Sequence, residues 1–180
     1  MAAATHREEA ARVLSAGTCL EGVVTYTICS EAEQDRNLKG GQGQVYKAYC
    51  STAGTDERDH FAVKSPVDPK RLGGLAREAQ VYFNIDPRKA PHLAFLSDVV
   101  RHEGVPLLVM EWADRGSLSD YLPKQQQVLD RCPPDRLPQM QKALTKQALA
   151  YAIQIARGLV SLHGTLGMVH QDLKPGGVFA

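Results

Sequence analysis

Short runs of apolar and β-branched residues, separated by polar, glycine-rich or proline-containing stretches, dominate the first part of the chain. Runs of four to eight such residues, bounded by turn-forming residues, are typical of β-strands. The clearest runs cover residues 22–30, 45–48, 60–64, 95–100 and 106–111. A Glu-Gly pair at 103–104 predicts a turn between the last two. This part of the chain is therefore predicted to be rich in β-structure.

One stretch within this region has a helical pattern instead. In residues 75–85, Leu75, Ala79 and Tyr82 follow one another at helical spacing and define an apolar face. The Asp-Pro pair at 86–87 ends the pattern, because proline disfavours the helical conformation in the residue before it. We predict a single amphipathic helix here.

The longest helical pattern covers residues 142–163, after a stretch of low complexity. The apolar stripe of this helix consists of Leu149, Ala152, Ile153, Ala156, Leu159, Val160 and His163. We expect part of the stripe to be exposed, which makes it a partner-binding surface or an aggregation liability. The preceding residues 123–141 hold three consecutive glutamines and several prolines, and are expected to form an exposed, irregular insertion, either a variable loop or a docking segment.

Composition excludes several classes of partner. The net charge of +1 gives no electrostatic basis for binding nucleic acid or an anionic membrane, and no apolar run is long enough to span a bilayer. The four cysteines are scattered and form no Cys-x-x-Cys pair, so reduced thiols and a cytoplasmic location are expected. Residues 1–19 are expected to form a tail or short helix without a secretory signal.

Three glycines lie within four residues, at Gly40, Gly41 and Gly43. Glycine adds no side chain to a core and loses more backbone entropy than other residues when it is ordered. Such a loop either forms a plain hairpin turn or allows backbone N–H groups to approach a ligand, for which phosphate is the commonest choice. The glycines alone do not decide between these readings.

Two charged residues stand in apolar surroundings. Lys64 ends an apolar strand, where its usual role is to extend its ammonium into water. Glu78 lies on nearly the same helical face as Leu75 and Tyr82. Burying a lone carboxylate costs several kcal/mol, so Glu78 either finds a cationic partner or reaches solvent at the edge of the stripe.

The segment 168–179 concentrates His170, Asp172 and Lys174 in five positions, followed at once by Pro175. This combination is poorly suited to a core. It suits a loop that holds a carboxylate where a hydroxyl proton must be accepted, with an ammonium beside it to face phosphate charge.

Taken together, these stretches resemble the eukaryotic protein kinase superfamily, over roughly residues 20–180. The motifs that carry the resemblance are, in chain order, the glycine loop with residues 45–48 (Val-Tyr-Lys-Ala), residues 61–64 (Phe-Ala-Val-Lys), Glu78, residues 116–122 (Gly-Ser-Leu-Ser-Asp-Tyr-Leu) and residues 170–175 (His-Gln-Asp-Leu-Lys-Pro). The resemblance implies an α+β fold: an N-lobe (20–110) with a five-stranded antiparallel sheet and one helix, then a hinge and an incomplete helical C-lobe (111–180).

The resemblance also implies an ATP site and a set of residues for it. The implied nucleotide-binding residues are Gly40, Gly43, Val45, Ala62, Lys64, Glu78, Met110, Glu111, Ala113 and Asp120. In this reading Lys64 contacts the α- and β-phosphates and Glu78 holds Lys64. The backbone of 111–113 would meet the adenine edge, and Asp120 would reach the ribose. Met110 would be the gatekeeper, although Met110 and Trp112 are equally explained by ordinary packing.

Asp172 and Lys174 would be the catalytic residues, and a lysine two positions after the aspartate is usual in serine/threonine kinases. Three departures stand out: Leu38 replaces the first loop glycine, Gln171 an arginine and Gly177 a metal-binding asparagine. Glycine has no side chain to coordinate a metal. No Asp-Phe-Gly segment follows, so the ligands of the Mg²⁺ expected for the family are missing, and we assign no metal-binding residue.

Two functional hypotheses follow from the resemblance. In the first, the chain is the N-terminal portion of an ATP-dependent serine/threonine protein kinase, truncated after the catalytic loop. In the second, it is a catalytically inactive, truncated pseudokinase that acts as a nucleotide-binding or interaction module. The sequence specifies neither the protein substrate nor a protein partner.

Overall fold

The computed structural model describes residues 14–30, 38–40, 43–51, 58–66 and 72–179. The chain divides into two compact units. The first consists of Met1–Phe83 and Phe95–Trp112, and the second of Asn84–Ala94 and Ala113–Ala180. No helix in the described part of the chain is long and apolar enough to cross a membrane.

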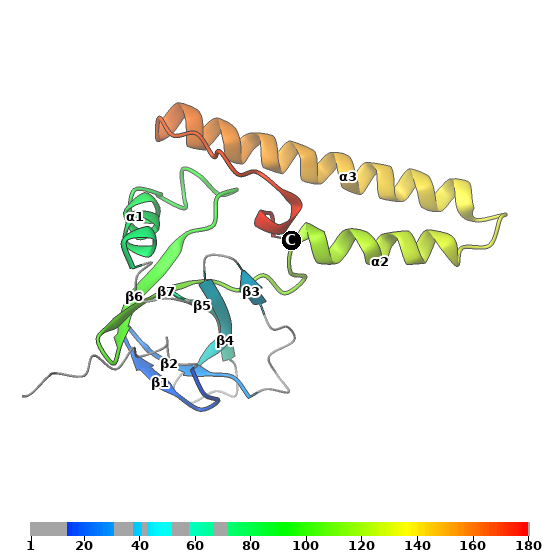
Figure 1. Ribbon diagram of the computed structural model, residues 1–180. Helices are drawn as coiled ribbons and strands as arrows, with labels where there is room; N and C mark the ends of the chain where they lie inside the picture. The colour runs from blue at the N-terminus through cyan, green and yellow to red at the C-terminus, as the bar shows by residue number, and fades with distance from the viewer. Residues whose placement is uncertain (1–13, 31–37, 41–42, 52–57, 67–71, 180) are drawn as a thin grey trace, which may run out of the picture. The chain divides into compact units, whose positions relative to one another are not determined.

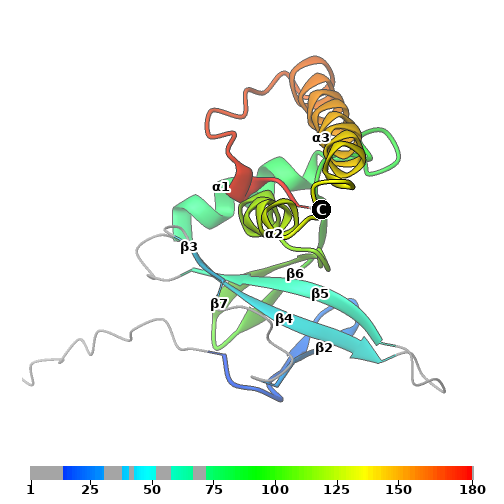
Figure 2. The ribbon, with the colours of Figure 1, turned by 90° about the vertical axis from the view of Figure 1, so that its right-hand side faces the viewer.

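The first unit is built on one antiparallel sheet, of seven strands within the described residues (Figure 1). These strands are β1 (Cys19–Glu21), β2 (Thr25–Ile28), β3 (Leu38–Gly40), β4 (Gly43–Ser51), β5 (Arg58–Ser65), β6 (Leu96–His102) and β7 (Val105–Glu111). Their order is β1-β2-β4-β5-β7-β6, with β3 also paired to β4. Figure 2 shows β4 and β5, the two longest strands, lying side by side. The predicted α+β fold with an antiparallel sheet is confirmed, but the sheet has seven strands among the described residues, where five were expected.

Two strands, β2 and β3, pair with different parts of β4. Ile28 pairs with Ala48, and ten positions later Leu38 pairs with Val45, only three positions before Ala48. β2 and β3 thus pair with neighbouring parts of the same strand, and the chain between Ile28 and Leu38 is seven residues longer than the stretch of β4 that they cover. The polar stretch 31–37, expected from the sequence to be a turn or strand edge, lies outside the described residues.

A core fills the inside of this curved sheet. Its fully buried members come from β1, β2, β4, β5, β6 and β7 and include Leu20, Ile28, Ala48, Val63, Val100, Leu107 and Val109. Helix α1 (Leu72–Phe83) packs on the other face, where Leu75 and Ala79 bury Leu108. The predicted helix is confirmed, with its start three residues earlier. The predicted turn is also confirmed, since Glu103 and Gly104 both have positive φ, as a tight two-residue hairpin requires.

Asp98 links the two ends of the sheet. Its Oδ2 atom accepts a hydrogen bond from the backbone N of Val23 (2.7 Å) and another from the hydroxyl of Tyr26 (3.4 Å). Asp98 lies at a register shift between β6 and β7. Burial, and then the charge of Asp98, raise the pKa of Tyr26 to about 12, so that Tyr26 remains a hydrogen-bond donor at neutral pH.

The second unit contains α2 (Leu118–Asp130) and α3 (Leu137–Val160), which ends in a π-helical turn, Ser161–Thr165. The expectation of an irregular insertion over 123–141 is therefore wrong for most of its length. Glutamine is a good helix former, and Pro138 lies in the first turn of α3, where its missing N–H costs nothing. The connection is confined to a few residues that include the Pro-Pro pair at 133–134.

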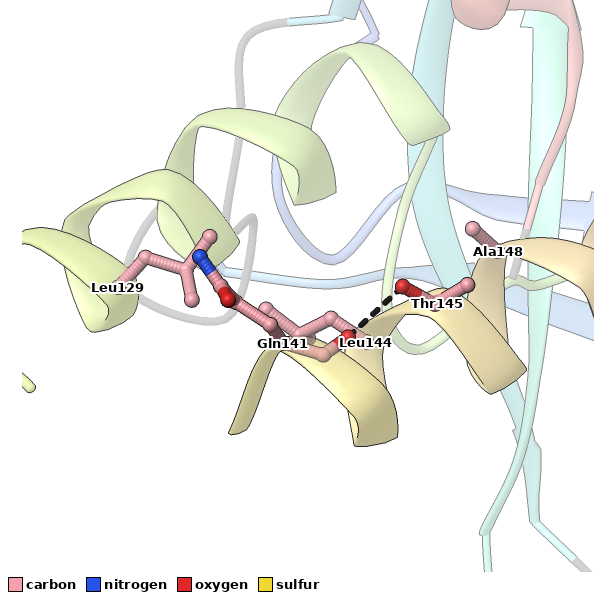
Figure 3. A pocket seen from close by; sticks show the side chains of 5 residues that line it. All are labelled: Leu129, Gln141, Leu144, Thr145 and Ala148. Carbon is pink, nitrogen blue, oxygen red and sulfur yellow. Dashed lines mark hydrogen bonds between the residues drawn. The ribbon is translucent and has the colours of Figure 1, made fainter. Parts of the chain in front are cut away.

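Side chains on facing turns join α2 and α3. Tyr121 donates a hydrogen bond to Oε1 of Gln147 (2.7 Å), and its ring meets the ring of Tyr151 edge-on at 5.8 Å. Farther along, an open hollow of about 520 Å³ separates the helices, lined by Leu129, Gln141, Leu144, Thr145 and Ala148 (Figure 3). The two helices are thus joined at one end and loosely packed at the other.

Candidate functional site

Strand register places several of the predicted nucleotide-binding residues on one surface of the first unit. Val45 lies opposite Lys64, Lys47 opposite Ala62, and Ala62 opposite Met110. Residues directly opposite in antiparallel strands project from the same face of a sheet. This surface, which we call the α1 face, is the side on which α1 packs, away from the core.

An ion pair forms on the α1 face. The Nζ atom of Lys64 lies 2.6 Å and 2.8 Å from the two carboxylate oxygens of Glu78 in α1. The side chains are only 19% and 25% exposed, so both charges are mostly shielded from water and each requires the other. The partner expected for Glu78 is therefore present. Contact of Lys64 with phosphate remains a prediction.

Tyr82 lies one turn after Glu78 in α1. Burial, and secondly the negative charge of Glu78, raise the pKa of the Tyr82 hydroxyl to about 12. Tyr82 therefore stays neutral over the whole physiological pH range and adds no competing charge beside the Lys64–Glu78 pair.

The glycine loop is a hairpin between β3 and β4. Gly40 pairs with Gly43, and the two residues between them lie outside the described part of the chain. A Cβ atom on Gly43 would come within 2.8 Å of the backbone oxygen of Ser65 and 3.3 Å of Cε of Lys64. Gly43 thus allows β4 to pass closely over the end of β5. The loop is therefore a hairpin turn, as one of the two interpretations of its glycines proposed, and phosphate binding by the loop remains a prediction.

The residues predicted to contact the base lie at the end of β7 and just beyond it. Met110 is half-buried on the α1 face, and Glu111 is the last residue of the strand. Partial burial raises the pKa of the Glu111 carboxyl above its usual value. Trp112 closes the first unit, and Ala113 begins the last segment of the second.

Asp120 already has a structural role in the first turn of α2. Its Oδ2 atom accepts hydrogen bonds from the backbone N (3.1 Å) and the hydroxyl (2.7 Å) of Ser117. Side chains that close a helix start in this way stabilise it by about 0.5–2 kcal/mol. A contact of Asp120 with a ribose remains a prediction and would add to this capping role.

The predicted catalytic loop lies in the second unit. The backbone N of Asp172 donates to the oxygen of His170 (2.8 Å), around Gln171, whose φ of 60° is positive. A tight turn with positive φ at a non-glycine residue stores strain, and such strain is concentrated at functional sites. The loop thus projects Asp172 instead of burying it.

The charge of Asp172 is balanced within the loop. The Nζ atom of Lys174 lies 2.6 Å from Oδ2 of Asp172, and the two side chains are 61% and 67% exposed. Asp172 is therefore accessible and has a cation beside it. The role of Asp172 as a proton acceptor remains a prediction. Such an exposed pair adds little to stability.

Backbone contacts anchor the C-terminal segment to the start of α2. The backbone N of Leu118 donates to the oxygen of Val178 (2.9 Å), and Ser117 and Phe179 form an isolated β-bridge. A single turn of 3-10 helix, Pro175–Gly177, precedes this contact. Within the described residues, no group of three or more potential ligands could hold a metal ion.

Sequence reasoning missed one contact on the α1 face. The ammonium of Lys47 lies 5.3 Å from the centroid of the Trp112 ring, within cation–π range. The sequence places Lys47 in a motif, and Trp112 in the 111–113 backbone or in ordinary packing, without linking the two side chains. No periodicity connects two residues so far apart in the chain, so only the register of β4, β5 and β7 could have suggested it.

Comparison with known proteins, like the Lys64–Glu78 pair, supports the resemblance to protein kinases. The family described as protein tyrosine and serine/threonine kinase matches residues 33–178. A calcium/calmodulin-dependent protein kinase type II from Schizosaccharomyces pombe is 29% identical over 178 residues, covering 96% of this chain and 31% of the relative. A mitogen-activated protein kinase kinase 1c from Physcomitrium patens is 30% identical over 88 residues, covering 49% of this chain and 21% of the relative.

The chain thus spans about a third or less of the length of these relatives. The family match nevertheless covers most of the chain and includes the Lys64–Glu78 pair and the Asp172 loop. The chain belongs to the protein tyrosine and serine/threonine kinase family.

Proposed function

We propose that this chain carries the nucleotide-binding and catalytic-loop part of a serine/threonine protein kinase, which transfers a phosphoryl group from ATP to a protein hydroxyl. The observation that supports this most strongly is the shielded Lys64–Glu78 pair on the α1 face, in register with Val45 and Ala62.

The residues of the α1 face fit ATP in chemistry. Val45 and Ala62 offer an apolar surface for a base, and Lys64 offers a fixed cation for phosphate oxygens. Glu78 holds the ammonium of Lys64 so that it does not have to be ordered when the phosphate arrives. ATP, when bound, supplies the phosphoryl group. We derive no step through Mg²⁺, because the described residues offer no set of ligands for it.

Asp172 is proposed to accept the proton of the substrate hydroxyl. Its carboxylate is exposed and can be reached by a substrate hydroxyl. Lys174, at 2.6 Å, is proposed to offset negative charge that develops on the phosphoryl oxygens. The serine/threonine preference rests on the position of Lys174, two residues after Asp172.

Calorimetric titration with ATP tests this proposal. Lys64→Met should weaken ATP binding at least about tenfold, the usual effect of losing a charge-assisted hydrogen bond. Glu78→Gln should weaken it less, because the ammonium remains but loses its anchor. Lys146→Met, which removes a cation from the exposed surface of α3, is the matched control and should bind as the wild type does. Equal affinity in all four proteins would refute the proposal.

The second hypothesis, a pseudokinase that binds nucleotide without transferring phosphate, is favoured by Gly177. The family carries a metal-binding asparagine at this position, and glycine offers no oxygen ligand from a side chain. Release of ADP with a peptide substrate distinguishes the two hypotheses. Turnover that disappears in Asp172→Asn supports the kinase. ATP binding without turnover supports the pseudokinase.

A further inference from the structure

The contact between Lys47 and Trp112 crosses a strand of the sheet. Lys47 is in β4 and Trp112 directly follows β7, while β5 lies between them and pairs with both strands. Lys47 and Trp112 are both half-buried. A cation 5.3 Å from an indole centroid is held by the negative face of the ring, and more strongly where water is partly excluded.

Register shows what lies beneath this contact. Directly opposite Lys47 on β5 is Ala62, and directly opposite Ala62 on β7 is Met110. Trp112 is the next residue along the chain whose side chain projects to the α1 face, two positions after Met110. Ala62 has the smallest side chain in this row and lies between the longer side chains of Lys47 and Met110.

The α1 face therefore has two chemically different ends. Toward one end Val45 and Lys64 form the next cross-strand row, which brings the cation assigned to phosphate. Toward the other end is the row of Lys47, Ala62 and Met110, and the ammonium of Lys47 lies over the ring of Trp112, which follows β7. The two rows are about 7 Å apart along the strand, which matches the width of a planar heteroaromatic base.

We propose that the Lys47–Trp112 pair forms the end wall of the base site, and that Lys47 acts as a positioning residue by fixing the plane of the Trp112 ring. A purine base resting on Ala62 would then have Lys64 on its phosphate side and the indole edge on the other. This inference rests on the proposed function, since it requires a nucleotide on the α1 face. The inference adds Lys47 to the site as a residue that holds the base in place through Trp112.

The competing explanation is that Lys47 only covers the ring of Trp112 and contributes to packing. In that case Lys47 would affect stability and leave nucleotide affinity unchanged. Trp112 is the only tryptophan in the sequence, so its emission reports directly on this wall. A ligand that contacts the indole should change the emission, and loss of the cation should alter both the emission and the response to ligand.

The experiment titrates the 180-residue chain with ATP, with tryptophan emission and calorimetry as readouts. The wild type should bind ATP with a change in emission. Lys47→Met should raise the Kd about threefold to tenfold, with an unchanged thermal midpoint, because the cation–π contact that fixes the ring is lost. Lys47→Arg should restore binding, since a guanidinium also stacks on an indole. If Lys47→Met does not fold, Trp112→Phe and Trp112→Leu replace it, and only the leucine variant should bind ATP weakly.

The outcomes separate this inference from the proposed function. If Lys64→Met binds ATP more weakly while Lys47→Met and Trp112→Leu bind it as the wild type does, the proposed role of the Lys47–Trp112 pair is refuted. The proposed nucleotide site is then still supported. If the wild type binds no ATP, or Lys64→Met binds it unchanged, both proposals fall. Weakened binding in Lys47→Met with rescue by Lys47→Arg supports the positioning role.

Discussion

The two units of the chain bury their apolar residues very differently. Among the described residues, all but three of the buried apolar side chains belong to the first unit, and the exceptions are Ala90, Leu118 and Leu162. The large exposed apolar side chains show the reverse: all but Val23, Val24 and Phe83 belong to the second unit. The first unit thus has a closed core, whereas the second presents apolar surface.

Helix α3 shows why the difference matters. Leu149, Ile153 and Val160, members of the stripe predicted from the sequence, are 61%, 45% and 71% exposed. The expectation that this stripe is partly exposed is confirmed. Since burial of apolar area is the main source of stability, the ion pair on the α1 face lies in the more stable unit and the Asp172 loop in the less stable one.

The sharpest test of this contrast compares one leucine from each unit. Leu107→Ala, in the core of the first unit at 2% exposure, should lower the free energy of unfolding by about 2–5 kcal/mol, because it removes buried atoms and leaves a cavity. Leu149→Ala, on the exposed stripe of α3, should change it by less than about 0.5 kcal/mol. Chemical denaturation followed by far-ultraviolet circular dichroism measures both. Equal losses would show that α3 is as tightly packed as the sheet.

A smaller effect is expected at the seam where Asp98 joins the ends of the sheet. A Cβ atom on Gly22 would overlap with Oδ2 of Asp98 and lie 2.6 Å from Cγ1 of Val100. Gly22→Ala should therefore lower the free energy of unfolding by about 1–3 kcal/mol, as overpacking does. Gly74→Ala is the matched control in α1, where a Cβ atom meets nothing within 4 Å. It should raise stability by about 0.5–1 kcal/mol, because alanine is the better helix former.

Thermal unfolding of the two variants decides between two views of the seam. A lower thermal midpoint in Gly22→Ala together with a higher one in Gly74→Ala would show that β1 and β6 are held in close contact. A loss in neither variant would mean that the β1–β2 hairpin can move away from Asp98, and the first unit would then be less closed than its core suggests.

The elements predicted correctly are those whose pattern is local. The strand runs and α1 follow from apolar spacing within a few residues. The carboxylate on the apolar face of α1 left a cationic partner or solvent as alternatives, and the family resemblance implied Lys64, which the structure places beside Glu78. The same argument could have been applied to Asp98, a carboxylate inside an apolar strand, but its partners come from a hairpin about 75 residues earlier in the chain.

The errors have an equally physical cause. The stretch 123–141 was predicted as a loop because prolines and repeated glutamines suggest irregular structure, yet most of it is helical. Pro138 lies in the first turn of α3, where its missing N–H is not needed, whereas α2 accommodates Pro123 in its interior. Glutamine favours a helix when its neighbours allow one. The Lys47–Trp112 contact could not be predicted, because it depends on the register of three strands.

The smallest expected effect lies in the second unit and uses a glycine again. A Cβ atom on Gly177 would meet nothing within 4 Å, and the positive-φ glycines do not include it. Neither space nor backbone conformation requires glycine there, in contrast to Gly22 and Gly43 in the first unit. Gly177→Asn should therefore shift the thermal midpoint very little, by less than about 0.5 kcal/mol in free energy of unfolding. A clear loss would show that the C-terminal segment packs more tightly against α2 than its exposure indicates, and would weaken the contrast between the two units.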